Sequence, residues 1–472
     1  MIDFVKLLNT PWKLFGELYQ FVKDDFIRIS NEIWIKTEAR NDYEKLSIRI
    51  FNCFMKIYGQ GNDQGKDQLV LIIEKYTATD DDYTFLCISM LKAIAEYMGK
   101  TRLGEIKQMG SIKTGKLTVT PRPANPIYES LSKPIRKPER IGVNIYNLAD
   151  FFQEISVIEE MNPKIVLRMP DPILKRSCRY IKRRIQKGLK IGISPFLRAG
   201  MEFKTASLID EWPDDEPTPF WFEEVKNIDV AKDRLLCLLD QCVQQGVNIL
   251  VLPELTIDPT LLEALRDWLC TNNRELISSG QNGLVMVVAG SFHVWKDNGD
   301  ICNVSTVLNH GGQVLWRQEK QQPFSVDQTD VQKTPELKRL LRISNAGGYE
   351  RIKSADHICC VDTPLGRICV CICLDFIHPD NLNAFRHSGI NVFLVPAMNH
   401  GNIRFQQAAW TFGGTNSASS FVAFGSFLQR GKDDANQENV SFHYLPDKNQ
   451  NYHYAMGEHI DLLTFEIGVN KR

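Results

Sequence analysis

The sequence has 472 residues, of which 43% are hydrophobic and 24% charged, as in an ordinary soluble globular protein. Lys and Arg number 56 and Asp and Glu number 57, so the net charge is −1, which excludes a globally basic nucleic-acid-binding protein. No apolar stretch approaches the ~20 residues that span a bilayer, and the first residues lack the apolar core of a signal peptide. With 12 scattered cysteines, these features predict a cytoplasmic protein without a disulfide framework.

The first third of the chain is expected to contain a helical domain, a linker and a connector. Residues 1–116 place apolar side chains three and four apart over several stretches, which predicts a helical N-terminal domain. Residues 117–140 are rich in proline and have no helical periodicity, so they predict a linker. Residues 141–188 are expected to form a helical connector that ends in a basic segment.

The basic segment, residues 175–190, holds eight Lys or Arg and no acid. A helix of this composition binds phosphate backbones, or it is a solvated helix that meets an acidic neighbour. Residues 209–224 carry seven Asp or Glu and supply such a neighbour, which favours the second interpretation. A protein or nucleic-acid partner for the N-terminal and basic regions stays open as the alternative.

From residue 189 onward, short and nearly continuous apolar runs alternate with amphipathic helical patterns. Continuous apolar runs of five to eight residues are typical of strands that are covered on both faces. Residues 231–246 and 258–269 show helical spacing, and Asp258 followed by Pro259 is a typical helix start. Residues 189–472 are therefore expected to form an α/β domain.

Three chemically capable side chains follow predicted strands of this domain: Glu254, Lys320 and Cys373. Strand ends in α/β sheets are where residues from distant parts of a sequence converge on one crevice. A thiolate is a nucleophile, a carboxylate accepts and returns protons, and an ammonium stabilises an oxyanion. If they converge, these groups can hydrolyse an amide or a nitrile, although none of the three is specific alone.

Around these residues the sequence resembles the carbon–nitrogen hydrolase (nitrilase) superfamily, from about residue 189 to 472. The segment VLPE (251–254) is similar to that around the family's first catalytic Glu, WRQEK (316–320) to its Lys segment and ICLDF (372–376) to its nucleophile segment. The connecting segments match in the same order: VVAGSF (287–292), CNVSTVLNHGGQVL (302–315), FLVPA (393–397) and a helix from Ala408 to Asn416.

The resemblance implies a four-layer α-β-β-α sandwich and hydrolysis through a thioester acyl-enzyme, with no metal or organic cofactor. By the same resemblance Glu254 is the general base, Lys320 the oxyanion stabiliser and Cys373 the nucleophile. The backbone amide of Leu374 would be a second oxyanion donor.

The family also implies a substrate pocket and a homo-oligomer. Asn399 and His400 follow the strand NVFLVPA, in a stretch that lines the substrate pocket of family members. The alternative for both is a solvated turn. Nitrilase-like sandwiches commonly pair through their outer helices, which predicts a homo-oligomer.

The sequence departs from the family pattern after Lys320. The family usually carries another Glu soon after the Lys, but here only Asp327 and Asp330 follow closely. The 36 residues between Lys320 and His357 are expected to form a lid or a surface loop.

Cysteines other than Cys373 also cluster in this region. They are expected to be buried core residues and not zinc ligands, because neighbouring positions on a flat strand do not converge on one ion. They are Cys359, Cys360, Cys369 and Cys371.

The function that follows is hydrolysis of a carbon–nitrogen bond, most readily an amide, in a small molecule. The alternative is a non-catalytic scaffold or sensor with a nitrilase-like fold, which binds a protein or nucleic acid through its N-terminal helical and basic regions. Neither reading includes a membrane.

Overall fold

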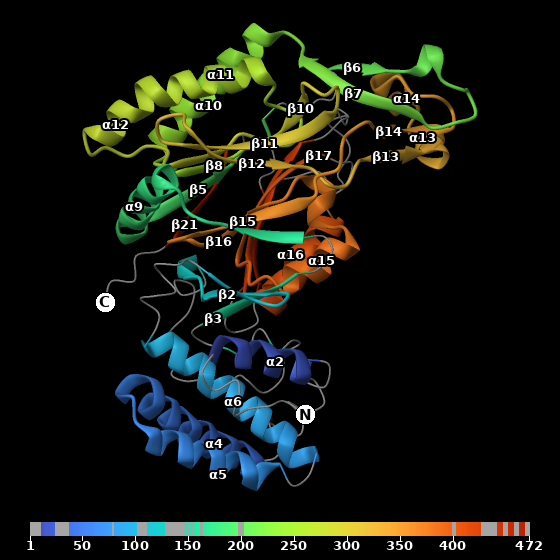
Figure 1. The fold of residues 1–472 in the computed structure, drawn as a ribbon. Coiled ribbons are helices and arrows are strands. Elements are labelled where there is room, and N and C mark those ends of the chain that lie inside the picture. The colour runs from blue at the N-terminus through green and yellow to red at the C-terminus, as the bar shows by residue number, and fades with distance from the viewer. Residues whose placement is uncertain are drawn as a thin grey trace. The chain divides into compact units, whose positions relative to one another are not determined.

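The structure is a computed structural model of the whole chain. It describes residues 11–23, 37–77, 80–101, 111–127, 148, 152, 155–160, 164–196, 203–398, 403–425, 441–446, 452–456 and 462–467. The chain divides into two compact units. The first unit comprises residues 1–123, 134–161 and 384–389, and the second comprises residues 124–133, 162–383 and 390–472. Figure 1 shows the elements of both.

The first unit contains the helices predicted for the N-terminal region, and they share one apolar core. Helix α6 contacts α2, α4 and α5. Its side chains at Leu86, Met90, Leu91 and Ile94 are buried, as the three- and four-residue spacing requires. The elements are α2 (Pro11–Lys23), α4 (Thr37–Phe54), a π-helical turn (Met55–Gly59), α5 (Asp63–Tyr76) and α6 (Asp80–Thr101).

A small antiparallel sheet completes the first unit, and the sequence analysis did not anticipate it. Its order is β1 (Ile112–Thr114), β2 (Leu117–Pro121) and β3 (Ile155–Glu159). The predicted linker thus begins with a strand, because the alternating residues of 117–121 pair with β3. The connector predicted to be helical over 141–188 contains β3 and a further strand, β4 (Lys164–Arg168), before helix α9 (Pro172–Lys187).

The second unit is built on two larger sheets. In the described part of the chain the first sheet has seven strands, in the order β10-β11-β9-β8-β5-β21, with β12 paired to β11. Strands β5, β8 and β9 are parallel and form its centre. The strands are β5 (Leu189–Ile193), β8 (Ile249–Val251), β9 (Met286–Val288), β10 (Phe292–Trp295), β11 (Ile301–Asn309), β12 (Val314–Glu319) and β21 (Leu463–Ile467).

The second sheet also has seven strands among the described residues, in the order β20-β19-β18-β17-β16-β15-β4. Strands β16, β17 and β18 are parallel. The strands added here are β15 (His357–Thr363), β16 (Gly366–Val370), β17 (Val392–Met398), β18 (Ser419–Gly425), β19 (Phe442–Pro446) and β20 (Tyr452–Met456).

The two sheets face each other, and helices cover their outer faces. Ile249 and Val251 of β8 lie in a core shared with Val370 and Leu394 of the other sheet. Leu250, which points the opposite way, packs in a second core with helices α10 and α11. The expected four-layer α-β-β-α sandwich is therefore confirmed (Figure 1). The helices are α10 (Ile228–Gln244), α11 (Pro259–Trp268), a π-helical turn (Leu269–Asn273), α12 (Arg274–Ser278), α15 (Pro379–Arg386) and α16 (Ile403–Asn416).

The segment between Lys320 and His357, which was expected to form a lid or a surface loop, contains strands and helices of its own. It joins a four-stranded sheet of order β13-β14-β7-β6, counted over the described residues. Strand β14 runs parallel to β7, so the sheet combines this segment with residues 203–225. The elements are β6 (Phe203–Ser207), a 3-10 turn (Ile209–Glu211), β7 (Thr218–Val225), β13 (Ser325–Asp327), α13 (Gln328–Lys333), α14 (Pro335–Leu341) and β14 (Gly347–Glu350).

Among the helices of the described ranges, none combines the length and the apolar character that crossing a bilayer requires.

Candidate active site

Glu254 lies three residues beyond β8, in a tight turn. The following residue, Leu255, has a φ of 58°, and Gly290 opposite has a φ of 51°. A Cβ atom at Gly290 would lie 2.1 Å from the carbonyl oxygen of Pro253, so only glycine fits beside this turn. The turn directs the Glu254 side chain inward, where it is 1% exposed.

Lys320 follows β12 and is equally buried. Its backbone amide donates to the carbonyl oxygen of Asn303 at 2.9 Å, and its own carbonyl accepts from Ala355 at 3.1 Å. The Lys320 Nζ donates to Glu254 Oε1 at 2.8 Å. The ammonium and the first carboxylate therefore meet, as their positions at strand ends led us to expect.

Cys373 begins a 3-10 turn, Cys373–Phe376, shortly after β16. Its φ of 49° is unusual for a residue with a side chain and marks a strained turn at the position of the sulfur. The thiol donates to the Met398 carbonyl oxygen at 3.5 Å and interacts with the Glu254 carboxylate. Glu254 in turn accepts from the Met398 amide at 3.1 Å, so the end of β17 holds both groups. The three predicted residues are thus brought to one place.

A second carboxylate, Glu350, completes the cluster, and the sequence analysis missed it. Glu350 ends β14, and its Oε2 accepts from Lys320 Nζ at 2.6 Å and from the Phe324 amide at 2.8 Å. The two acids considered for this role lie elsewhere in the fold: Asp327 and Asp330 form a capping box at the start of α13, and both are exposed. The acid beside Lys320 comes from a later strand because the intervening residues fold as a structured insertion.

Asn303 and His293 support the two carboxylates. The Asn303 Nδ2 donates to Glu254 Oε1 at 3.0 Å and to Glu350 Oε1 at 2.9 Å. His293 Nδ1 accepts from the Phe222 amide at 2.8 Å, so its proton lies on Nε2, which contacts Glu350 Oε1 at 2.8 Å. His293 therefore donates to Glu350 and orients it. Asn303 was noted in the sequence only as part of a connecting segment, and His293 was not singled out.

The charges of the cluster determine its protonation. Burial raises the pKa of Glu254, and the charge of Glu350 raises it further, while Lys320 opposes both. Burial acts to lower the pKa of Lys320, but the two carboxylates outweigh it and raise that pKa. Burial disfavours ionised Glu350, yet Lys320 and His293 lower its pKa. The cluster at neutral pH is thus an ammonium beside an ionised Glu350 and a Glu254 of enhanced basicity.

Cys373 is a thiol at rest. Burial raises the pKa of Cys373 well above its ordinary value, and the negative charge of Glu254 adds to this, while Lys320 acts against both. The thiolate is therefore not present in advance, and the Glu254 carboxylate in contact with the thiol can accept its proton.

Asp375 connects the Cys373–Phe376 turn to the segment after Lys320. Its carboxylate accepts from the Gln321 amide at 3.1 and 3.2 Å and from the Gln322 amide at 2.8 Å. Asn381 Nδ2 donates to the Asp375 carbonyl oxygen at 2.8 Å. Burial raises the pKa of Asp375 to about 7, although the hydrogen bonds from the Gln322 and Gln321 amides act to lower it. Asp375 therefore fixes the spacing between Cys373 and Lys320.

Of the remaining predicted site residues, the structure describes Leu374 but not Asn399 and His400. Leu374 is the second residue of the 3-10 turn, and the first amides of such a turn have no partner within it. Asn399 and His400 lie outside the described residues, so their contribution to a substrate pocket stays a prediction.

The other cysteines of the region are buried on or beside β16, the strand that precedes Cys373. Cys369 and Cys371 place their sulfurs 3.4 Å apart, and burial raises the pKa of both thiols. Cys359 and Cys360 are also buried, with raised pKa values. Across the ranges that the structure describes, no three His, Cys, Asp or Glu side chains are arranged to hold a metal ion.

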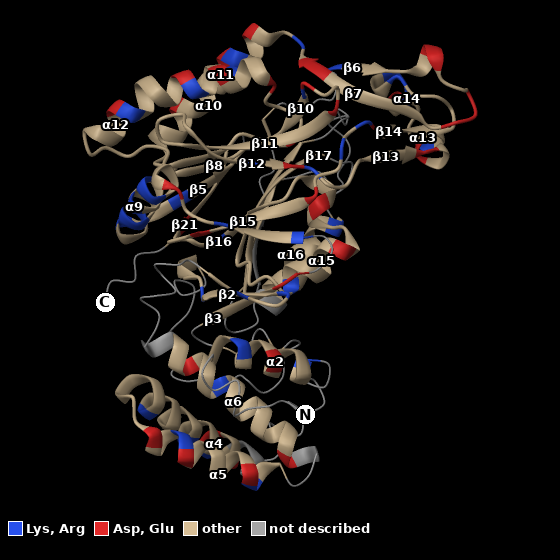
Figure 2. Ribbon diagram, in the orientation of Figure 1, with Lys and Arg blue, Asp and Glu red and all other residues tan. Residues whose placement is uncertain are grey.

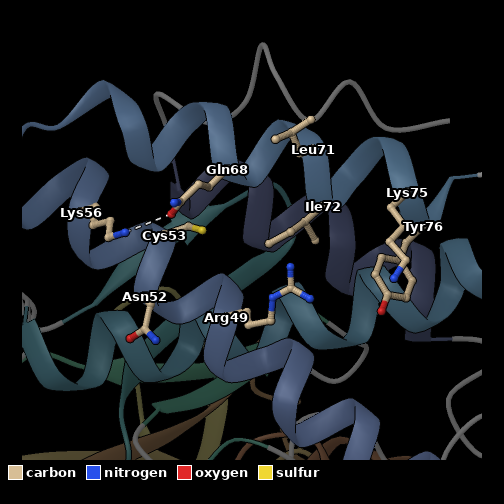
Figure 3. Close-up of a pocket in the computed structure, with 9 residues that line it drawn as sticks. All are labelled: Arg49, Asn52, Cys53, Lys56, Gln68, Leu71, Ile72, Lys75 and Tyr76. Atoms are coloured by element: carbon tan, nitrogen blue, oxygen red, sulfur yellow. Dashed lines mark hydrogen bonds between the residues drawn. The ribbon is translucent and has the colours of Figure 1, made fainter.

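A separate cavity of about 530 Å³ lies in the first unit, between α4 and α5 (Figure 3). Its cations are Arg49, Lys56 and Lys75, and no acid lines it. Burial raises the pKa of its one thiol, Cys53, despite the nearby Lys56 and Arg49. The remaining lining residues are Asn52, Gln68, Leu71, Ile72 and Tyr76. This cavity can attract an anion, but it lacks the adjoining carboxylates, ammonium and thiol of Glu254, Glu350, Lys320 and Cys373.

A comparison with protein families matches residues 227–415 to the carbon-nitrogen hydrolase model. Residues 227–415 belong to the carbon–nitrogen hydrolase family. This confirms the resemblance to the nitrilase superfamily, and the matched range contains Glu254, Lys320, Glu350 and Cys373. The N-terminal region of the chain has no family match, and no curated protein matches the chain.

The solved structures that resemble this chain are distant relatives. Saccharomyces cerevisiae Nit3, a member of branch 10 of the nitrilase superfamily, is 14% identical with a TM-score of 0.36, over 59% of this chain and 90% of that one. An amidase from Nesterenkonia sp. is 14% identical with a TM-score of 0.36, over 60% and 90%. A glutamine-dependent NAD+ synthetase from Acinetobacter baumannii is 14% identical with a TM-score of 0.36, over 59% of this chain and only 45% of that one.

Proposed function

We propose that the protein hydrolyses a carbon–nitrogen bond, most readily an amide, in a small molecule, through a thioester on Cys373. The observation that carries the proposal is the buried ammonium of Lys320, held between Glu254 and Glu350 next to the Cys373 thiol. A water-poor cluster with a nucleophile, a base and a cation is what acyl transfer requires. The family supports an amide over a nitrile, and transfer of the acyl group to an amine is a variant of the same chemistry.

In the first half-reaction, Glu254 accepts the proton of Cys373 while the sulfur attacks the amide carbonyl carbon. The π electrons of the carbonyl move to oxygen, and the oxyanion is stabilised by Lys320 and by the Leu374 amide. When the carbonyl re-forms, the carbon–nitrogen bond breaks, and the amine leaves with the proton held by Glu254. The product is a thioester on Cys373 with Glu254 again ionised.

In the second half-reaction, Glu254 removes a proton from water as the water oxygen attacks the thioester carbonyl. The carbon–sulfur bond breaks, the acid departs, and the sulfur regains the proton from Glu254. The raised pKa of Glu254 suits both steps, because a more basic carboxylate accepts a proton more readily from a thiol and from water.

The hydrogen bonds of Lys320 support its role as oxyanion stabiliser. An ammonium has three N–H donors, and two of them are directed to Glu254 and Glu350. One donor is left for the substrate oxygen. Glu350 thereby positions Lys320, and Asn303 and His293 position Glu350.

The test is release of ammonia or amine from a panel of small amides, compared with the matching nitriles. Cys371→Ala is the matched control for Cys373→Ala, because Cys371 is a buried thiol two residues away. We expect Cys373→Ala to lose turnover and Cys371→Ala to retain it. Equal activity in both variants contradicts the proposal, and inactivity of the wild type towards every amide and nitrile favours the non-catalytic scaffold or sensor.

We also propose that the hydrolase unit forms a homo-oligomer through α16. Ile403 and Trp410 lie seven residues apart on this outer helix, and they are 51% and 57% exposed. An exposed apolar pair on one helix face is typical of a contact between subunits. Light scattering of the full chain should show a dimer or larger assembly that Trp410→Glu shifts towards monomer.

A further inference from the structure

Helix α9 presents a continuous face of exposed cations, which we name the α9 basic face. At 100° per residue its members fall within an arc of about 140°, and they extend along about 18 Å of the helix. Figure 2 shows this concentration of Lys and Arg on α9. The α9 basic face consists of Lys175, Arg176, Arg179, Lys182, Arg183 and Lys187, all exposed.

The opposite side of α9 is fixed in the protein core. Leu174 and Ile181 are fully buried and belong to the core between the two large sheets. Asp171 caps the helix by accepting from the Leu174 amide at 2.8 Å. The orientation of the cations is therefore imposed by packing, and the apolar side of the helix is not available for insertion into a membrane.

The acidic segment 209–224 does not neutralise the α9 basic face, contrary to the interpretation that the sequence favoured. Its Glu223 and Glu224 pair with Lys204 at 3.3 and 3.2 Å, and Asp210 pairs with Arg342 at 3.6 Å. The reason is the fold: these acids belong to the sheet of β6 and β7. Throughout the described ranges, no ion pair involves a member of the α9 basic face.

Two acids beside α9, Asp171 and Asp362, are already paired. Asp171 accepts from Arg168 at 3.0 Å. Burial raises the pKa of Cys178 on α9, and the nearby charge of Asp362 raises it further. The Asp362 carboxylate accepts from the Arg367 guanidinium at 2.7 and 3.0 Å. The positive field of α9 is therefore not balanced from within the described structure.

Neighbouring residues extend this field and add a ring. Burial and the charges of Arg176 and Arg274 lower the pKa of His310, which places Arg274 of α12 in the same field. The ring of Tyr180 lies 4.4 Å from that of His310, and the Arg183 guanidinium lies 5.9 Å from the Tyr180 ring centroid. Cations interleaved with a ring are typical of surfaces that bind nucleic acid.

We propose that the α9 basic face binds the phosphate backbone of a nucleic acid. A protein interface would need apolar anchors at its centre, and between Lys175 and Lys187 the exposed arc offers only charged side chains and Gln186. Half of the six cations are guanidinium groups, whose planar donors match phosphate oxygens. Contacts with the backbone carry no sequence information, so binding is expected to be sequence-independent.

The length of the face predicts how binding responds to salt. About 18 Å corresponds to about five phosphates along one strand, at roughly 3.4 Å each. Neutralising about four to six phosphates gives a logarithmic slope of roughly −4 to −5 against salt for duplex DNA. Affinity should therefore fall by about 10²- to 10³-fold between 50 and 200 mM salt.

The experiment measures fluorescence anisotropy of the full-length protein with a labelled 20-nucleotide single-stranded RNA and a 20-base-pair DNA duplex. The test variant carries Lys175→Gln, Arg179→Gln, Lys182→Gln and Arg183→Gln. The control variant makes the same change of charge at exposed positions of other elements: Lys226→Gln, Lys232→Gln, Lys333→Gln and Arg339→Gln. Melting temperatures verify that both variants are folded.

We expect the test variant to bind at least tenfold more weakly at 50 mM salt, with a shallower salt slope, and the control variant to bind like the wild type. Comparing RNA with duplex DNA identifies the preferred nucleic acid. Equal weakening in both variants, or no binding by the wild type at 50 mM salt, overturns the proposal. So does equal or tighter binding to polyglutamate or to anionic vesicles, since either would indicate a general polyanion or membrane surface.

Discussion

Lys320 Nζ and Glu350 Oε2 lie 2.6 Å apart in the core, although thirty residues separate them in the chain. Glu350→Gln removes the charge that keeps Lys320 in place, so we expect kcat/KM for the best amide to fall by about 10²- to 10³-fold, as for loss of one oxyanion donor. Steady-state kinetics measure this. Asp330→Asn is the control, because Asp330 is an exposed capping residue of α13 and should leave kcat/KM unchanged. An equal loss of kcat/KM in both variants would contradict a role for Glu350 in positioning Lys320.

Cys373 should react slowly with alkylating agents in the absence of substrate. Its raised pKa leaves little thiolate at neutral pH, whereas Cys237 and Cys270 are exposed. Brief treatment with iodoacetamide at pH 7.5, followed by peptide mass spectrometry, should show carbamidomethyl groups at the two exposed thiols first. A dominant adduct at Cys373 under these conditions would show that the thiolate exists before substrate binds.

Asn303 should matter for activity beyond its effect on folding. Asn303→Ala removes the donor shared by Glu254 and Glu350, so we expect a loss of about 1–3 kcal/mol in the free energy of unfolding and at least a tenfold lower kcat/KM. Asn309→Ala on the same strand is the matched control, since Asn309 is also buried but bonds only to its own turn. Urea unfolding and amide hydrolysis, measured on both variants, separate the two effects. Matching losses of activity would contradict a role in positioning.

Asp375 should make the protein less stable as the pH rises. Its pKa is about 7 in the folded chain and about 4 when unfolded, so between these values the folded state holds a proton that the unfolded state lacks. The free energy of unfolding therefore decreases with increasing pH in this window; the contribution is full below about pH 4 and lost above about pH 7. The decrease amounts to about 2.5 kcal/mol between pH 5 and 7.5.

Asp375→Asn tests this directly, because the amide stays neutral at every pH. Urea unfolding of the variant and of the wild type should show the stability difference shifting in favour of the variant as the pH rises from 5 to 7.5. A difference that is constant with pH would mean that Asp375 does not titrate in this range.

The sequence carried enough information to place Glu254, Lys320 and Cys373, because each follows an apolar run that could only be a buried strand. It did not reveal Glu350. That residue ends a four-residue strand that begins with two glycines and follows a helical insertion, so neither periodicity nor proximity to Lys320 marks it. His293 was equally unmarked, since its importance comes from contacts with Phe222 and Glu350 that only the folded chain brings together.

In the N-terminal region the sequence predicted the helices but not the small sheet. Its helices follow from the apolar spacing, but the small sheet does not, because β3 lies beyond the predicted linker and pairs with β2 over a long separation in the chain. Pairings of this kind depend on tertiary contacts that local patterns do not encode. The same limit applies to the acidic segment, whose partners are set by the sheet to which it belongs.

Glu254 and Lys320 extend from one sheet of the sandwich, whereas Cys373 extends from the other. The proposed hydrolysis therefore depends on the contact between the two sheets. Gentle heat or low urea that loosens this junction should abolish hydrolysis while circular dichroism is still native, so inactivation would be the earliest sign of denaturation.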